Sequence, residues 1–225
     1  MEGAGEVERV TFLTDIMEIE RLSKRLKEGW EVRSHTVGTD AVPYLIKRNV
    51  MRQLPISLEA ADGDSHGSGS DGSILCNVTD SRHDACQLEE LDVPVTGAPS
   101  VEGHRIESCQ FEYHIIHSAS YNVPVLYFTA CKSDGKLLTL EEVWRQVPGS
   151  YQERLRHQRW TFITQQEHPL LGRPFFQLHP CRTADLMKSV APISKGNYVV
   201  TWLSSVGPVV GLELPLAFAN LCQAR

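Results

Sequence analysis

Residues 60–73 interrupt the chain with a composition that a packed core cannot use. Gly, Ser and Asp supply 11 of these 14 residues. Such a stretch buries too little apolar surface to offset the entropy that is lost when a chain becomes ordered. The sequence therefore predicts a flexible insertion from about residue 52 to about residue 104, set within a single domain that spans residues 1–225.

This part of the chain also holds most of the negative charge. Residues 59–92 contain nine Asp or Glu and one Arg, a balance of −8, whereas the whole chain has a formal net charge of −6. The other residues together therefore carry +2, which is close to neutral. Because nucleic-acid binding requires a basic surface, the composition argues against a nucleic-acid partner.

The N-terminus and the cysteines indicate a soluble, cytoplasmic protein. Residues 1–8 hold three Glu and no base, which is not the pattern of a secretory signal. No apolar run approaches the roughly 20 residues of a membrane helix, so we expect no transmembrane segment. Six cysteines permit three disulfides, but without a signal peptide we expect free thiols.

The first predicted element is an amphipathic helix over residues 7–28, which Gly29 ends. Its apolar side chains recur every three or four positions; they are Phe12, Ile16, Ile19, Leu22 and Leu26, with Leu13 and Met17 beside them. Strands are expected after it, rich in β-branched and aromatic residues. They cover residues 30–35, 44–50, 107–118 and 122–131, and a tight turn at 119–121 joins the last two.

Short helices follow these strands. Thr139 and Glu142 have the spacing of a capping box at the start of one helix. A loop is expected over residues 165–180 because prolines and a glycine punctuate it. We also expect a strand over 160–164 and helices over 183–190, 197–205 and 215–222, the last beginning at Pro215. Neighbouring strands with helices before and after them indicate an antiparallel α+β fold.

Cys181 has the sequence context of a reactive thiol. It follows Pro180 and precedes Arg182 at the predicted start of a helix, with His179 two residues before it. A helix N-terminus and neighbouring cations lower the pKa of a thiol and stabilise the thiolate. The alternative is a buried and inert thiol, which is the common state of a free cysteine.

A zinc site built from Cys109, His114 and His117 is not expected. Side chains alternate between the two faces of a strand, so Cys109 and His117 share one face while His114 points the other way. No Cys-x-x-Cys pair occurs in the chain. We therefore expect no structural zinc, no catalytic metal and no cofactor.

A cysteine hydrolase is one catalytic alternative. It requires a base beside the thiol and a group that orients the base. His168 and His179 are candidate bases, and Asn197 is a candidate orienting group. The local signatures of papain-like and caspase-like enzymes do not occur in the sequence.

An ordered set of motifs resembles the autophagy-related protein 10 family of ubiquitin-like-conjugating enzymes. The motifs are Tyr-Asn-Val-Pro-Val-Leu-Tyr-Phe at 121–128, Asp-Gly at 134–135 with Leu-Thr-Leu at 138–140, Ile-Thr-Gln-Gln-Glu-His-Pro at 163–169, Leu-Gly at 171–172, Phe-Phe at 175–176, His-Pro-Cys at 179–181, Trp-Leu-Ser at 202–204 and Val-Gly-Pro-Val-Val-Gly-Leu at 206–212. The resemblance covers roughly residues 113–218 and leaves the insertion out.

The resemblance implies a fold like that of ubiquitin-conjugating enzymes, a small antiparallel sheet flanked by helices. It also implies that Cys181 is the catalytic cysteine. In that family the cysteine takes autophagy-related protein 12 as a thioester from the activating enzyme, autophagy-related protein 7. A lysine of autophagy-related protein 5 then attacks the thioester, and an isopeptide bond forms.

The same resemblance implies catalytic helpers. Ordinary ubiquitin-conjugating enzymes carry His-Pro-Asn several residues before the cysteine, but no Asn occurs here between residues 122 and 197. Another group must therefore stabilise the oxyanion of the transfer reaction. Tyr121 and His179 look like the helpers of this family, and Thr164 and Gln165 are weaker candidates.

Other interpretations stay open from the sequence. The related family that transfers autophagy-related protein 8 to the lipid phosphatidylethanolamine also carries His-Pro-Cys, although the Tyr-Asn-Val-Pro strand and the short chain favour transfer to a protein. A non-catalytic adaptor with the same fold is a further alternative. We also expect the hairpin over residues 111–131 to present a sheet edge, which an acceptor could pair with by strand addition.

Overall fold

The computed structural model describes residues 5–57, 104–155, 162–190 and 196–223. The chain divides into two compact units, Met1–Ile56 with Ile106–Arg225 and Ser57–Arg105. Nearly all of the second unit, and with it most of the predicted insertion, lies outside the described residues, so the flexibility of the insertion stays a prediction. The fold below is that of the first unit.

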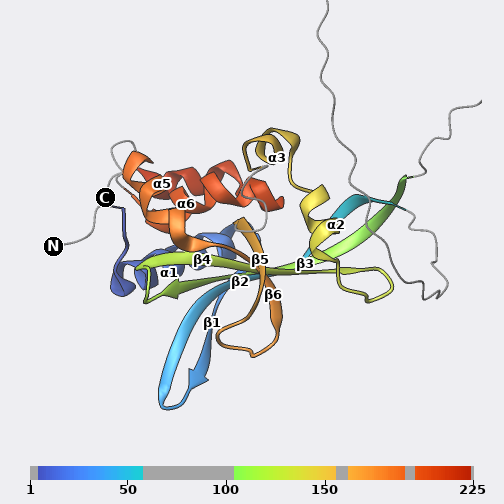
Figure 1. The fold of residues 1–225 in the computed structure, drawn as a ribbon. Helices are drawn as coiled ribbons and strands as arrows, with labels where there is room; N and C mark the ends of the chain where they lie inside the picture. Colours follow the sequence, from blue (N-terminus) through green and yellow to red (C-terminus); the bar gives the residue numbers. More distant parts are fainter. Residues whose placement is uncertain (1–4, 58–103, 156–161, 191–195, 224–225) are drawn as a thin grey trace, which may run out of the picture. The chain divides into compact units, whose positions relative to one another are not determined.

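Six strands form one sheet in the order β1-β2-β3-β4-β6-β5 (Figure 1). The pairs β1–β2, β3–β4, β4–β6 and β5–β6 are antiparallel. The strands are β1 (Trp30–Val37), β2 (Asp40–Ser57), β3 (His104–Ser118), β4 (Val123–Lys132), β5 (Ile163–Glu167) and β6 (Pro174–Leu178). The sheet with its flanking helices confirms the predicted α+β class.

The larger helices α1, α5 and α6 cover one face of this sheet (Figure 1). The five α-helices of the described residues are α1 (Arg9–Leu26), α2 (Leu140–Arg145), α3 (Gly149–Leu155), α5 (Thr183–Val190) and α6 (Tyr198–Val206). Three short 3-10 helices are also present: η1 (Pro180–Arg182), η2 (Gly207–Val210) and η3 (Leu216–Cys222). No helix of the described residues has the length and apolar character that crossing a membrane requires.

The apolar stripe of α1 packs as its spacing predicts, but it is narrower than expected. Phe12, Ile16 and Ile19 are fully buried, whereas Met17 and Leu26 are 58% and 41% exposed. Met17 lies one residue past Ile16, which places it about 100° around the helix and beyond the covered arc. The helix ends at Leu26 because Lys27 adopts a left-handed conformation, and its N–H donates to the Ser23 carbonyl.

The sheet separates two apolar clusters because strand side chains alternate between its faces. Along β3, Phe111, Tyr113 and Ile115 face the helices and join the main core. Ile116 joins a smaller cluster on the other face, together with Tyr44, Ile46, Val125, Tyr127 and Phe175. Leu170 and Leu171, from the turn between β5 and β6, pack over this second cluster.

The predicted loop over residues 165–180 is wrong. Most of β5 and all of β6 lie in this stretch, and Thr164 pairs with Gln177 in the hairpin. Pro174 is tolerated because it occupies the first residue of its strand. The Pro-Gly punctuation belongs to the turn, in which the N–H groups of Leu171 and Gly172 both donate to the His168 carbonyl.

Two element boundaries and one position in the sheet also differ from the predictions. The insertion does not begin at residue 52, because β2 continues through Ser57. The last helix is a 3-10 helix that begins at Leu216, with Pro215 as its N-cap rather than its first residue. The hairpin of β3 and β4 does not form a sheet edge, since β2 flanks it on one side and β6 on the other. The edges of the described sheet are β1 and β5.

The capping box of α2 is confirmed. Thr139 Oγ1 accepts from the Glu142 N–H, and the Glu142 carboxylate accepts from the Thr139 N–H at 2.8 Å. The same carboxylate pairs with Lys132 at 2.6 Å, which joins the helix to β4. Lys132 lowers the pKa of Glu142 together with the Thr139 hydrogen bonds, against the opposing effect of burial.

Candidate active site

Cys181 lies in the turn that connects β6 to α5. It is the middle residue of η1, its side chain is exposed, and Pro180 beside it is buried. The N–H of His179 donates to the Phe162 carbonyl at 3.0 Å, so the chain is still anchored to the β5 side of the hairpin just before the cysteine. The thiol is therefore exposed to solvent, and a hydrogen bond to the β5 side of the hairpin fixes the backbone just before it. Cys181 is therefore not the buried thiol of the alternative interpretation, and its reactivity stays a prediction.

His179 folds back over the cysteine as the N-cap of η1. Its Nδ1 accepts a hydrogen bond from the Cys181 N–H at 3.2 Å. Accepting this bond requires a lone pair on Nδ1, so the neutral imidazole carries its proton on Nε2. The Nε2–H group is therefore the hydrogen-bond donor of this imidazole.

Tyr121 meets His179 from the turn between β3 and β4. The two rings approach edge to face, with 6.1 Å between their centroids. The Tyr121 side chain is 46% exposed, and the following Asn122 has a φ of +48°. Asn tolerates the left-handed conformation better than other residues with a side chain, which allows this tight turn. The structure thus brings together the three predicted site residues, Tyr121, His179 and Cys181.

A cleft of about 460 Å³ opens beside His179, between β6, α5 and α6. Its walls are mainly apolar and include Leu178, Leu186 and Val206. Arg182, which is exposed, lines it next to Cys181. The cleft depends on how β6, α5 and α6 pack against one another, so the sequence carries no local signal for it.

The weaker helper candidates lie away from the turn of Tyr121. Thr164 and Gln165 are on β5, and β6 separates that strand from β4. Thr164 Oγ1 is buried and makes no hydrogen bond. Gln165 is exposed and lies opposite Phe176 in the β5–β6 ladder. Neither residue joins the Tyr121–His179 contact.

Of the three residues weighed for a cysteine hydrolase, His179 lies beside Cys181, but His168 and Asn197 do not join it. Asn197 is fully buried as the N-cap of α6, and its amide nitrogen donates to Asp15 O at 3.0 Å and Glu18 Oε2 at 3.1 Å. His168 is fully buried in the turn between β5 and β6. Because both side chains are already bound elsewhere, neither can serve as the base or as its orienting group.

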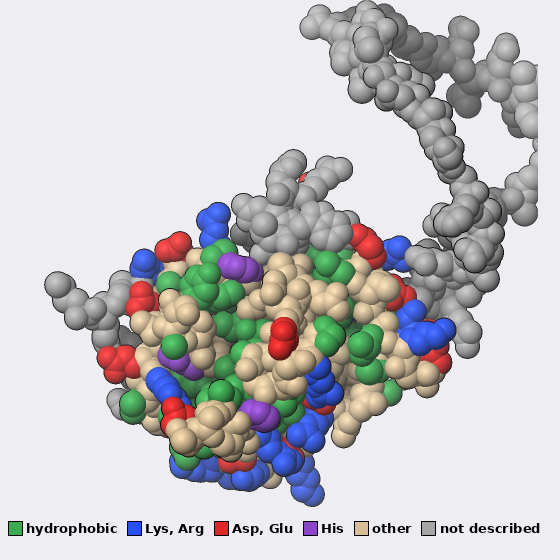
Figure 2. Space-filling model, turned by 60° about the horizontal axis from the view of Figure 1, so that its bottom comes forward, with side chains coloured by type: hydrophobic (Ala, Val, Ile, Leu, Met, Phe, Trp, Pro, Cys, Tyr) green, Lys and Arg blue, Asp and Glu red, His purple; other side chains and the backbone are tan. Residues whose placement is uncertain are grey.

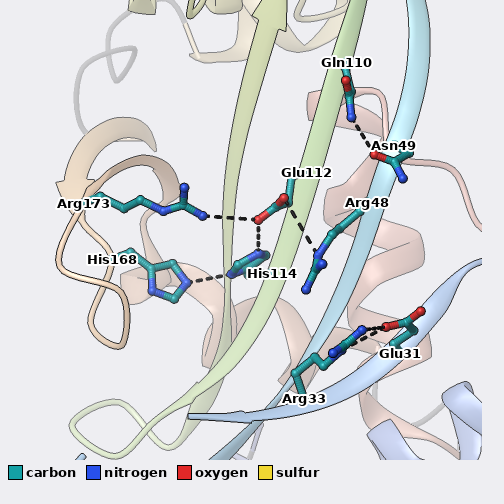
Figure 3. A network of polar contacts seen from close by, with 9 residues as sticks. All are labelled: Glu31, Arg33, Arg48, Asn49, Gln110, Glu112, His114, His168 and Arg173. Carbon is teal, nitrogen blue, oxygen red and sulfur yellow. Dashed lines mark hydrogen bonds and ion pairs between the residues drawn. The ribbon is translucent and has the colours of Figure 1, made fainter. Parts of the chain in front are cut away.

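A buried chain of hydrogen bonds holds His168 on the face of the sheet opposite the helices (Figure 3). Its Nδ1 accepts from the N–H groups of Leu170 and Leu171, so its proton is on Nε2. This Nε2–H donates to Nδ1 of His114 at 2.8 Å, and His114 Nε2–H donates to Glu112 at 2.7 Å. The direction of every bond in the chain is therefore determined.

The charges along this chain follow from their surroundings. Burial, with His114 and Arg173 nearby, lowers the pKa of His168 to about 4. The hydrogen bond from His114 lowers the pKa of Glu112, and Arg48 and Arg173 act in the same direction. His168 is thus neutral near pH 7 and belongs to the packing of the sheet. Figure 2 shows that on this face hydrophobic side chains are interspersed with basic and acidic ones.

The three residues weighed for zinc do not converge. Cys109 is fully buried in the core under the helices, whereas His114 is in the chain of bonds on the opposite face. His117 Nε2 donates to the Val7 carbonyl at 2.8 Å. Within the described ranges, no group of three His, Cys, Asp or Glu side chains is arranged to hold a metal ion. The described cysteines, Cys109, Cys131, Cys181 and Cys222, are all free thiols, and Cys76 and Cys86 lie outside the described residues.

Comparison with known proteins places this chain in a family. The sequence model of the family described as "Autophagocytosis associated protein, active-site domain" matches residues 11–217. The chain is 44% identical to the ubiquitin-like-conjugating enzyme ATG10 of Homo sapiens over 164 residues, which cover 69% of this chain and 74% of that protein.

Two further relatives carry the same name. The Arabidopsis thaliana protein is 41% identical over 145 residues, which cover 61% of this chain and 63% of the relative. The Dictyostelium discoideum protein is 38% identical over 119 residues, which cover 47% of this chain and 52% of the relative. The matched regions therefore span between about half and three quarters of these relatives' lengths.

Proposed function

This chain belongs to the ATG10 family of ubiquitin-like-conjugating enzymes of autophagy, and on that premise we propose that Cys181 carries autophagy-related protein 12 as a thioester and transfers it to a lysine of autophagy-related protein 5. Autophagy-related protein 7 is the proposed donor. The cytoplasm is the proposed setting, because it keeps an exposed thiol such as Cys181 reduced.

The first step is a thioester exchange. The Cys181 thiolate attacks the carbonyl carbon of the thioester on the activating enzyme, a new carbon–sulfur bond forms, and the activating enzyme's cysteine leaves as a thiolate. The nucleophile and the leaving group are chemically alike, so the exchange needs an accessible thiolate and no strong hydrolytic base. The exposure of Cys181 supports this role.

The second step is aminolysis. The neutral lysine amine attacks the thioester carbon, a carbon–nitrogen bond forms and negative charge collects on the carbonyl oxygen. The carbon–sulfur bond then breaks, the Cys181 thiolate leaves, and the amine gives its proton to water. Donors aimed at the developing oxyanion lower the barrier of such a reaction. In the proposed mechanism the Nε2–H of His179 and the hydroxyl of Tyr121 supply these donors.

The contact between Tyr121 and His179 beside the thiol is the observation that carries the proposal. His179 accepts from the Cys181 N–H and its ring contacts the Tyr121 ring, so both residues that would supply the donors are grouped with one exposed cysteine. Ordinary ubiquitin-conjugating enzymes use an Asn for the oxyanion. Two described Asn residues follow residue 122: Asn197, whose amide donates to α1, and Asn220, which is exposed in η3.

Reconstitution with purified activating enzyme and autophagy-related protein 12 tests the assignment. The wild-type protein should form an adduct that a thiol reductant cleaves. Cys181→Ser should form an ester-linked adduct that resists the reductant, and Cys181→Ala should form neither. The assignment fails if the wild type forms no thiol-sensitive adduct under conditions that charge the activating enzyme.

The charged protein then distinguishes the acceptors. Autophagy-related protein 5 and vesicles containing phosphatidylethanolamine are offered in parallel, each with the ubiquitin-like protein that the corresponding reaction uses. We expect transfer to the protein alone. Transfer to the lipid would indicate the autophagy-related protein 8 reaction, release by water would indicate a hydrolase, and normal conjugation by Cys181→Ala would indicate an adaptor.

A further inference from the structure

The residues just before α1 lie across the turn that presents Tyr121. The N–H of Val7 donates to the Asn122 carbonyl at 2.8 Å. The carbonyl of the same residue accepts from His117 Nε2 at 2.8 Å. Val7 is buried, and its two main-chain groups therefore hold both arms of the β3–β4 turn, at its start and at its end.

The same segment is held against the helix that follows Cys181. The Gly5 carbonyl accepts from the hydroxyl of Tyr198, at the start of α6, over 2.7 Å. A Cβ atom added to Gly5 would collide with the carbonyl oxygen of Ala184 in α5 and would lie 2.9 Å from the backbone nitrogen of Lys188. Gly5 also has a φ of +90°. No residue with a side chain fits this contact unless the segment moves away from α5.

These contacts connect the two halves of the proposed site. Tyr121 and Asn122 belong to the turn that Val7 holds, while Cys181 precedes the helix that Gly5 touches. The Tyr121 side chain is 46% exposed, so packing around the ring restrains it weakly. The place of its hydroxyl therefore depends on the backbone of the turn, and the turn depends on residues 5–7.

We infer that residues 5–7 position Tyr121 relative to His179 and Cys181, so that the transfer step depends on this N-terminal segment. The inference rests on the proposed function of Cys181. Residues 5–7 act as positioning residues, because they reach the reacting atoms only through the turn and α5. A displacement of about 1 Å at a catalytic group is enough to slow a reaction by up to about 100-fold.

Gly5→Ala is the test variant, and Gly29→Ala is its matched control. Gly29 has a φ of +81°, close to that of Gly5, but a Cβ added there meets no atom within 4 Å. The control therefore reproduces the backbone strain without the collision. We expect Gly5→Ala to slow transfer from charged Cys181 to the acceptor lysine by about 10-fold, while thioester formation and both steps of Gly29→Ala change less than about twofold.

Tyr198→Phe provides a second variant that leaves the backbone unstrained. It removes only the hydroxyl that donates to the Gly5 carbonyl. Transfer should slow in the same direction and by less than in Gly5→Ala, with the melting temperature of each variant measured beside the rates. The inference is overturned if both variants transfer at the wild-type rate, or if the two chemical steps fall together in proportion to the lost stability.

A double-mutant cycle separates positioning from general stabilisation. If residues 5–7 act through Tyr121, Gly5→Ala should have little further effect on transfer in a Tyr121→Phe background, because the hydroxyl that it displaces is already absent. Multiplicative effects of the two substitutions on the transfer rate would refute the inference. These outcomes differ from failure of the proposed function, in which the wild type itself forms no thioester.

Discussion

Nδ1 of His179 lies 3.2 Å from the main-chain nitrogen of Cys181 and accepts its hydrogen bond. The bond does two things at once. It caps the short helix that presents the thiol, and it requires the neutral imidazole to carry its proton on Nε2. A residue that could have been a simple helix cap therefore also offers a hydrogen-bond donor beside the cysteine.

Replacing His179 should separate these two roles. His179→Ala removes the cap and the donor, and we expect transfer to the acceptor lysine to fall by about 100-fold, the usual effect of losing one oxyanion donor. His179→Asn keeps a capping acceptor and an amide donor, so it should retain more activity. Single-turnover discharge of the charged enzyme measures both. A wild-type rate for His179→Ala would show that the imidazole only caps.

Tyr121→Phe tests the hydroxyl without removing the ring that contacts His179. We expect transfer to slow by about 10- to 100-fold because one proposed oxyanion donor is lost. Thioester formation should be nearly unchanged, because in that step the attacking and leaving groups are both cysteine thiolates of similar reactivity. Tyr121→Ala serves as the comparison. If Tyr121→Phe matches the wild type and only Tyr121→Ala is slow, the residue acts through packing.

Stability should fall in acid because of His168. In the folded protein the pKa of His168 is about 4, whereas the ordinary value for a histidine is 6.5. Between pH 4 and pH 6.5 the His168 imidazole is protonated in the unfolded chain but neutral in the folded protein. The contribution of His168 to the free energy of unfolding is therefore fully present above about pH 6.5 and decreases as the pH falls toward 4. By pH 5 the loss is about 2 kcal/mol. Urea unfolding of the wild type and of His168→Gln at pH 7 and pH 5 measures it, and equal pH dependence in the two proteins would contradict the assignment.

Asp15 should contribute to stability and not to chemistry. It is 2% exposed, and its Oδ2 accepts from the N–H groups of Tyr198 at 2.8 Å and Val199 at 3.3 Å at the start of α6. Asp15→Ala leaves these donors without that acceptor, and we expect a loss of about 1–3 kcal/mol in the free energy of unfolding. Asp185→Ala, at an exposed carboxylate, is the control. A loss no greater than in the control would mean that water replaces the carboxylate.

Deleting residues 60–73 should leave the chemistry in place. These residues lie outside the described part of the structure, and Tyr121, His179 and Cys181 all belong to the first unit. We expect thioester formation within about twofold of the wild type, because all three proposed site residues belong to the first unit. A substitution of the same 14 residues by a neutral Gly-Ser linker is the control, and failure of both variants to charge would assign the segment a role in partner binding.

Local sequence patterns correctly predicted the helices, caps and strands that depend on interactions between residues close together in the sequence. The Thr139–Glu142 box, the buried stripe of α1, the β3–β4 hairpin and the short helices after Cys181 are examples. The same holds for the pair His179 and Cys181, which are two residues apart. The β5–β6 hairpin was missed because its Pro and Gly residues serve at the ends of strands and in the turn, while its buried residues Phe175 and Phe176 could not be assigned to a sheet from spacing alone.

By itself the sequence determined the α+β class, the acidic stretch at residues 59–92, the candidate thiol and, through its motifs, the resemblance that names the site residues. Only the tertiary structure decided that Tyr121 meets His179, that Asn197 and His168 are bound elsewhere, and that Val7 holds Asn122. The physical reason is distance along the chain. Capping and amphipathic periodicity act over a few residues, whereas contacts between distant segments depend on strand order and on which side chains the core has room to bury.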